Sequence, residues 1–212
     1  MKKSNLVVAL AALAVSFIAA PASAQYFYLG VGAGQSFGSG GNSSGVVGTT
    51  TVVTTGLDSN KTSWQVNGGY QFTPVWGLEI QYTDLGSRSG AAIFTGGVNG
   101  TAAIPSTKSY QWGVAGTGTY AFNENWFARG KLGVSSNHID NSTATFGGVT
   151  FATGGGSKTD VLAGAAFGYN WNKNVSTRLE YEYFGKFNSA NGNATSNFKG
   201  NNLGLRLQYS FQ

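Results

Sequence analysis

Apolar and polar residues alternate along the end of the chain, over residues 203–211. Leucine or an aromatic residue occupies every second position, and polar or small residues, including Arg206, lie between them. Because successive side chains of a strand point to opposite faces, this segment predicts a strand with one apolar and one polar face. Such a strand suits either the wall of a membrane barrel or one layer of a soluble sandwich.

The same alternation recurs along the chain and predicts eight strands. They cover residues 26–37, 61–72, 77–85, 108–122, 126–137, 158–170, 175–187 and 199–211. Each is about as long as the ~9–11 residues that a tilted membrane strand needs.

The connections between these segments alternate in length. Long ones cover residues 38–60, 86–107, 138–157 and 188–198, and short ones cover residues 73–76, 123–125 and 171–174. Short turns at one end and long loops at the other are typical of outer-membrane barrels, whereas sandwich crossings give no such alternation. The pattern predicts an all-β, eight-stranded, antiparallel, up-and-down transmembrane β-barrel. The long loops are rich in Gly, Ser, Thr and Asn, so we expect them to be mobile and without secondary structure.

The N-terminal residues have the features of an export signal. Lys2 and Lys3 precede an apolar run over residues 6–20, and the small residues 22–24 follow it. The run is shorter than the ~20 residues of a spanning helix. We therefore predict a cleaved signal peptide at residues 1–24 and a barrel domain at residues 25–212.

Composition favours the membrane barrel over the sandwich. Only 10% of the residues are charged, against about 25% in soluble domains, while aromatic residues make up 14% and glycines number 33. The expected location is the bacterial outer membrane. A net charge of +5 is too small to indicate a nucleic-acid partner, and the lack of cysteine excludes a disulfide framework. A secreted soluble sandwich remains the alternative on composition alone.

If the apolar faces meet lipid, the polar faces line the lumen. This places seven charged residues inside: Glu79, Arg129, Lys131, Arg178, Glu180, Glu182 and Arg206. Eight strands enclose a space that side chains can just fill, and an unpaired buried charge is costly. We expect these four bases and three acids to form a charge network.

Two further patterns concern the ends of the barrel. Aromatic residues gather near the short turns, as in an interfacial belt: Tyr70, Phe72, Trp76, Tyr120, Phe122, Trp126, Tyr169, Trp171 and Phe211. At the other end Lys61, Lys108, Lys158 and Lys199 each stand at the start of a strand. These lysines predict contacts with lipopolysaccharide, and a solvated rim is an equally good interpretation.

Catalytic and metal chemistry find little support. The single histidine, His138, has Ser136 and Asp140 two positions away, which raises a lipid-A-modifying enzyme as a minor alternative. A triad is recognised by geometry and not by spacing, so we favour a solvated rim histidine and no enzyme activity. With no cysteine and one histidine we expect no metal site, and no cofactor.

Three stretches, residues 69–86, residues 169–183 and the terminal LGLRLQYSF, resemble the OmpA-type transmembrane domain and related small outer-membrane β-barrel proteins. The resemblance implies a lumen salt bridge between Glu79 and Arg178, with Arg129 as a further lumen arginine. A second pair of that family has no counterpart, because Thr117 and Gly168 stand at its positions. The sequence also departs from that family in showing no peptidoglycan-binding domain after the last strand, so we do not expect wall anchoring. It also implies an assembly signal made of Gly204, Leu207, Tyr209 and Phe211, here followed by Gln212.

The expected function is a structural or surface-interaction role, with a plugged lumen and loops that bind a host or phage ligand. Expected partners are membrane lipid, lipopolysaccharide and, during insertion, the barrel-assembly machinery; we expect a monomer. The first alternative is a narrow, low-conductance pore. The lipid-A-modifying enzyme is the second.

Overall fold

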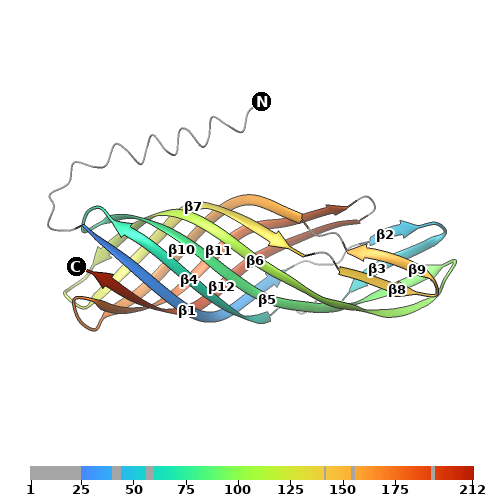
Figure 1. Ribbon diagram of the computed structural model, residues 1–212, viewed down its shortest axis with the longest axis horizontal. Coiled ribbons are helices and arrows are strands. Elements are labelled where there is room, and N and C mark those ends of the chain that lie inside the picture. The colour runs from blue at the N-terminus through green and yellow to red at the C-terminus, as the bar shows by residue number, and fades with distance from the viewer. Residues whose placement is uncertain (1–24, 40–43, 56–59, 141, 154–155, 192–193) are drawn as a thin grey trace, which may run out of the picture.

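Alternating side chains build eight long strands that form the wall of a barrel (Figure 1). The structure, a computed structural model, describes residues 25–39, 44–55, 60–140, 142–153, 156–191 and 194–212. The wall strands are β1 (Tyr26–Ser39), β4 (Asn60–Gln71), β5 (Trp76–Gly96), β6 (Gly100–Ala121), β7 (Trp126–Ile139), β10 (Gly156–Asn170), β11 (Val175–Asn191) and β12 (Ala194–Phe211).

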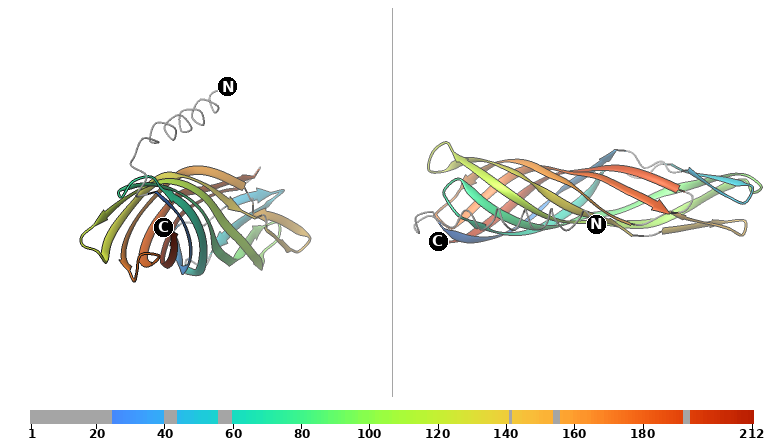
Figure 2. Two further views of the ribbon diagram at one scale, coloured as in Figure 1. Left: turned by 60° about the vertical axis from the view of Figure 1, so that its left-hand side comes forward. Right: turned by 90° about the horizontal axis from the view of Figure 1, so that it is seen from above.

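The wall closes on itself through antiparallel pairing of neighbouring strands. β1 pairs with both β4 and β12, and β5 pairs with β6, so each wall strand has two neighbours. In the closing register Phe27 lies opposite Phe211 and Val31 lies opposite Leu207. The oblique view on the left of Figure 2 shows the sheet curving round. These pairings confirm the predicted eight-stranded barrel.

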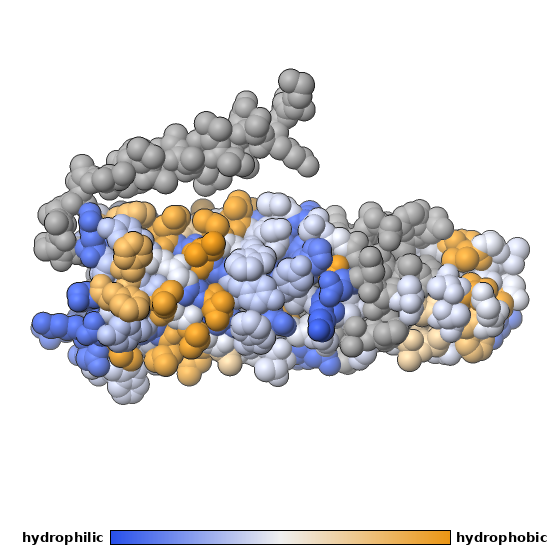
Figure 3. Space-filling model, in the orientation of Figure 1, coloured by the Kyte–Doolittle hydropathy of each residue, from blue (hydrophilic) through white to orange (hydrophobic). Residues whose placement is uncertain are grey.

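The outer surface of the wall is apolar and its inner surface is polar. Large apolar side chains such as Leu132, Leu205 and Phe167 are exposed, while Gln65, Gln111 and other polar side chains are buried. On the face seen in Figure 3, apolar residues gather on the barrel wall between two more polar zones. Among the described residues, no helix has the length and apolarity needed to cross a membrane.

The expectation of long loops without secondary structure is wrong for the described residues. β5 and β6 extend far beyond the wall, and additional strands form β2 (Ser44–Val47), β3 (Thr50–Thr55), β8 (Ser142–Phe146) and β9 (Val149–Thr153). β3 pairs with the outer part of β5, and β8 pairs with β9. We call residues 44–55, 89–107 and 142–153 the outer lobe.

The outer lobe has a hydrophobic core of its own, which explains why it is ordered into strands. Val52, Ala92, Phe94 and Ala144 are buried in it, and the rings of Phe94 and Phe146 stack with centroids 5.9 Å apart. A Gly-Gly turn with positive φ at Gly147 and Gly148 joins β8 to β9. Burial of these side chains stabilises strands that wall contacts alone would not hold.

Two glycine bulges interrupt the wall near its outer end. Gly86 in β5 and Gly185 in β11 have φ of 78° and 77°, and the strand registers shift at both places. A residue with a Cβ would be strained in this conformation. The residues before them, Leu85 and Phe184, point into the lumen.

The short turns and the described C-terminal residues lie together at one end, and the outer lobe lies at the other (Figure 1). The predicted signal peptide, residues 1–24, lies outside the described residues and stays a prediction.

Candidate functional site

All seven charged residues predicted for the lumen lie inside the barrel. Strand alternation places Arg129 and Lys131 on the inner face of β7, while β11 contributes one arginine and two glutamates. Each of the seven side chains is at most 6% exposed, and the full set is Glu79, Arg129, Lys131, Arg178, Glu180, Glu182 and Arg206. The structure therefore brings together residues from β5, β7, β11 and β12.

Glu79 of β5 is the centre of the half nearer the short turns. Its carboxylate lies 3.1 Å from Arg178 Nη2 and 3.2 Å from Lys131 Nζ. The hydroxyl of Tyr28 and the amide of Asn67 each donate a hydrogen bond of 3.1 Å to the same carboxylate oxygen. The Glu79–Arg178 pair is the one that the family resemblance implies.

Lys131 joins this half of the network to the half nearer the outer lobe. Its ammonium group pairs with Glu79, with Glu180 at 2.6 Å and with Glu182. It also donates to Gln81 Oε1 at 2.6 Å. One cation therefore neutralises parts of three carboxylates, which keeps the cost of their mutual repulsion low.

Glu180 and Glu182 also pair with arginines of the neighbouring strands β11 and β12. Arg178 Nε lies 2.9 Å from Glu180, and Arg206 Nη2 lies 2.8 Å from Glu182. Arg206 Nε lies 3.7 Å from Glu180. Each of these carboxylates thus contacts at least two cations.

Beyond the charge network, three apolar side chains fill the lumen towards the outer lobe. Leu85, Leu162 and Phe184 are fully buried and form one cluster together with the small side chain of Ala115. The backbone oxygens at the bulges are satisfied from inside, since Ser36 Oγ donates to Leu85 O at 2.8 Å and Asn137 Nδ2 donates to Phe184 O at 2.7 Å. We call Leu85, Leu162 and Phe184 the apolar layer. This layer was not predicted from the sequence, because apolar residues were assigned to the lipid face.

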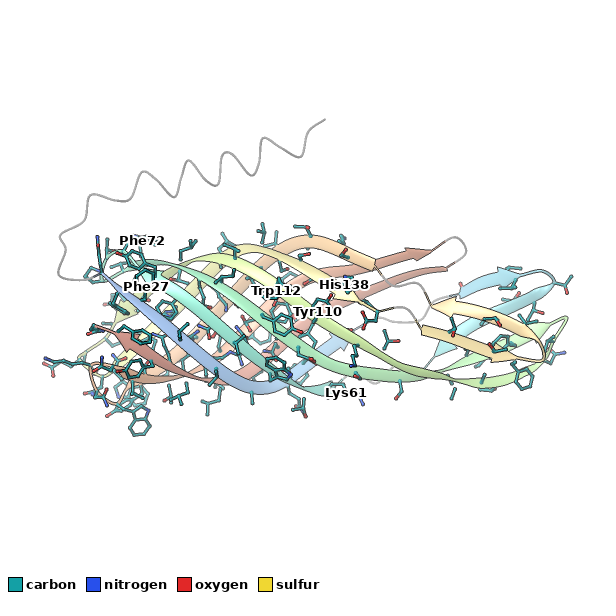
Figure 4. All side chains as sticks on the ribbon, viewed as in Figure 1. Phe27, Lys61, Phe72, Tyr110, Trp112 and His138 are labelled. Carbon is teal, nitrogen blue, oxygen red and sulfur yellow. The ribbon has the colours of Figure 1, made fainter. Side chains whose placement is uncertain are left out.

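The candidate catalytic group of the sequence analysis does not assemble into a triad. His138 lies on the outer face of β7, where its ring packs against Tyr110 with centroids 4.8 Å apart, and Trp112 lies beside it (Figure 4). Its Nε2 is 3.7 Å from Asp140 Oδ1, and within the described part of the chain no hydrogen bond joins Ser136 to His138. Across the described residues there is also no group of three His, Cys, Asp or Glu that could hold a metal ion.

Rings on the outer surface form two belts. At the short-turn end Trp126 contacts Phe167 and Tyr169, and Phe27 and Phe72 lie at the same end (Figure 4). The second group, nearer the lobe, consists of Trp64, Tyr82, Tyr110, Trp112 and His138. Paired aromatic belts mark the two interfaces of a membrane, so the wall between them is the spanning part.

The rim lysines and the terminal strand are placed as follows. Lys108 is exposed at the outer end, Lys61 is half-buried there, and Lys158 Nζ lies 3.8 Å from Asp160. The backbone of Lys199 lies in β12 beside β1, and its side chain is outside the described residues. In the predicted assembly signal Leu207, Tyr209 and Phe211 are exposed on the outer face, and Gly204 is buried on the inner face.

The family model for the outer membrane protein beta-barrel domain matches residues 8–211. The chain belongs to this family. This outer-membrane β-barrel protein is therefore located in the bacterial outer membrane, where the lipid-facing wall meets lipid and lipopolysaccharide.

Solved structures agree with this fold at low sequence identity. OprG of Pseudomonas aeruginosa has a TM-score of 0.57 with 14% identity, covering 89% of this chain and 97% of OprG. Ail of Yersinia pestis, solved with the heparin analogue sucrose octasulfate, has a TM-score of 0.52 with 18% identity, covering 89% and 99%. The outer membrane protease OmpT of Escherichia coli has a TM-score of 0.52 with 12% identity, covering 88% and 97%. No curated protein sequence matches the chain. At these identities the likeness supports the fold alone, and these proteins differ in activity.

Proposed function

We propose that this outer-membrane β-barrel protein is a non-enzymatic surface protein whose barrel is plugged and whose outer lobe binds a ligand outside the cell. The observation that carries the proposal is the contrast between the two parts. Paired charges and the apolar layer occupy buried positions inside the barrel, whereas the outer lobe is an ordered sheet that carries an exposed face.

The plug is supported by burial at two levels of the lumen. The charge network crosses from β5 to β7 and β11, with contacts near 3 Å, so an ion would have to displace paired side chains. Above it the apolar layer offers a passing ion no polar ligand, and desolvating an ion there is costly. The expected conductance is very low.

Carboxylate, ammonium, guanidinium and imidazole groups are absent from the sequence of the outer lobe. None of the residues 44–55, 89–107 and 142–153 is Asp, Glu, Lys, Arg or His. One face of its sheet is packed on the lobe core, and the other carries exposed threonine and aliphatic side chains on paired strands: Ser44, Val46, Thr51, Ile93, Thr95 and Thr101. We call this the threonine face. Hydroxyls beside aliphatic groups suit an uncharged ligand, such as a neutral glycan or an uncharged protein surface of a host cell or phage.

A comparison with Ail sharpens the ligand class. Ail is solved with a sulfated heparin analogue. The threonine face has no basic residue to pair with sulfate, so we propose that it does not take such a polyanion.

Adhesion of whole cells tests the proposal. Val46→Lys with Ile93→Lys places two charges on the threonine face, and Pro74→Lys with Val75→Lys adds two charges in an exposed short turn at the opposite end as a matched control. We expect cells with the threonine-face variant to lose roughly tenfold in adhesion to host cells or to an array of neutral glycans, as loss of about 1.4 kcal/mol implies. Equal adhesion by the threonine-face variant and the control would refute the role of the face.

A narrow pore is the second candidate function, and one observation favours it. Within the described lumen, side-chain atoms of Gln65, Gln71 and Thr117 are buried without a hydrogen-bond partner, so polar groups border a potential path. Discrete openings in planar bilayers would support the pore.

We propose no catalytic role for His138, because its ring packs on Tyr110 at the lipid-facing surface. Mass spectrometry of lipid A from cells with the native protein and with His138→Gln tests this, and we expect identical profiles.

The remaining partners follow from the ends of the barrel. Lys61, Lys108 and Lys158 contact anionic groups of lipopolysaccharide at the outer rim. Leu207, Tyr209 and Phe211 of β12 bind the barrel-assembly machinery during insertion. The protein acts as a monomer.

A further inference from the structure

A half-enclosed cavity lies inside the barrel mouth at the short-turn end. Its volume is about 650 Å³, and it is bordered by the turns after β6 and β10 and by the ends of β1 and β12. Outer-membrane barrels place short turns in the periplasm, so this cavity opens to the periplasm. We call it the vestibule. The short-turn end of the barrel is at the left in Figure 1.

Arg129 lines the inner end of the vestibule and is only 6% exposed. Its Nε donates to Thr119 Oγ1 at 3.1 Å, and its Nη1 donates to Gln208 Oε1 at 3.2 Å. Among the described residues, its Nη2 has no hydrogen-bond partner. The guanidinium therefore keeps donor capacity although its side chain is buried.

The charge of Arg129 is also the least compensated in the lumen. Its closest carboxylate oxygen, on Glu79, is 3.9 Å away. Each of the other three lumen bases has a carboxylate within 3 Å, and these bases are Lys131, Arg178 and Arg206. Four bases share three acids, so the one surplus positive charge of the network lies at Arg129, beside the vestibule.

We propose that the vestibule binds a small carboxylate from the periplasm, with Arg129 as its charged anchor. A guanidinium offers a planar pair of donors that matches a carboxylate, and a buried position strengthens such a bond. The volume suits a small molecule or the end of a peptide. The vestibule is also lined by Glu124 and Lys173, whose opposite charges balance, and by neutral amide side chains from its turns, including Asn125, Asn172 and Asn174. This site is separate from the outer lobe and does not depend on the function proposed for it.

Titration calorimetry on the full barrel in lipid nanodiscs tests the site. The probes are N-acetyl-alanyl-alanine, its C-terminal amide, acetate and inorganic phosphate. We expect saturable binding of the free acid. The amide should bind more weakly than the acid by roughly tenfold or more, because a charge-assisted hydrogen bond is lost. If acetate and N-acetyl-alanyl-alanine bind with equal affinity, the site recognises the carboxylate alone. If the peptide binds more tightly than acetate, the site recognises the end of a peptide. Both results support the proposal.

Variants separate this site from general charge effects. Arg129→Gln should weaken binding roughly tenfold or more, and Arg129→Lys should weaken it less, because the charge remains while the fork is lost. Arg88→Gln makes the same substitution in β5 at the opposite end of the barrel and should leave the affinity unchanged. Heat-modifiable gel mobility checks that each variant is folded. If a variant does not fold, the comparison of acid and amide on the native protein still tests the site. Equal affinity of the native protein for acid and amide, native affinity of Arg129→Gln, or tighter binding of phosphate than of the peptide would overturn the proposal.

Discussion

Replacement of Glu79 by glutamine removes the carboxylate at the centre of the lumen network. The substitution keeps the size of the side chain and its ability to accept from Tyr28 and Asn67, so the main change is the charge. Arg178 and Lys131, which now lie 3.1 and 3.2 Å from the carboxylate, lose a partner. The surplus positive charge of the lumen rises from one to two.

The expected loss of stability is large because the cations left behind stay buried. Removal of one partner from a buried ion pair costs about 3–5 kcal/mol. Both cations keep a second carboxylate, Glu180, at 2.9 and 2.6 Å, so we expect the lower half of this range, about 3–4 kcal/mol.

Urea unfolding in lipid vesicles, followed by tryptophan emission and by heat-modifiable gel mobility, measures this loss. Glu124→Gln is a matched control, because Glu124 is exposed in a short turn and its replacement should cost no more than about 0.5 kcal/mol. In the double variant with Arg178→Gln, the losses should fall short of the sum of the single ones by about 1 kcal/mol or more, because the two side chains interact. A Glu79→Gln barrel as stable as the control would refute the network as a source of stability.

Three further tests probe separate parts of the structure. In the same urea assay, Arg129→Gln should lower the free energy of unfolding by less than about 1 kcal/mol, and Arg178→Gln should lower it by about 3–5 kcal/mol. Of these two arginines, Arg178 alone has carboxylates near 3 Å. Equal losses would contradict the uneven charge balance. Phe184→Ala should cost about 3–5 kcal/mol, because a fully buried ring is lost from the apolar layer, and unchanged stability would contradict its packing. Leu132→Arg lies on the lipid face half-way along β7 and should lower the stability measured by refolding in vesicles by about 2–4 kcal/mol. Ser136→Arg lies nearer the outer interface and should lower it by about 0–1 kcal/mol. The reverse order would contradict the position of the membrane.

The wall could be predicted from the sequence because period-two alternation is dictated by a boundary between lipid and lumen. The same rule placed Arg129, Lys131 and Arg178 inside. It could not predict which carboxylate each base contacts, since contacts across the lumen depend on the stagger of strands that are far apart in sequence.

The outer lobe was missed for a different reason. Its Gly, Ser and Thr content is typical of loops, and its core is assembled from side chains such as Val52, Phe94 and Ala144, which come from different connections. One local signal was present: Gly147-Gly148 between Phe146 and Val149 is typical of a two-residue hairpin. The apolar layer was missed because the inner surface was assumed to be polar throughout, although Leu85 and Phe184 follow the alternation of their strands.

Single-channel recording in planar bilayers tests the filled lumen most directly. The native barrel is purified in its folded form and added at low concentration, and Glu79→Gln and Phe184→Ala are recorded under the same conditions. The account predicts no discrete openings of the native barrel and openings in one or both variants. Regular discrete openings of the native barrel, unchanged by either substitution, would contradict it.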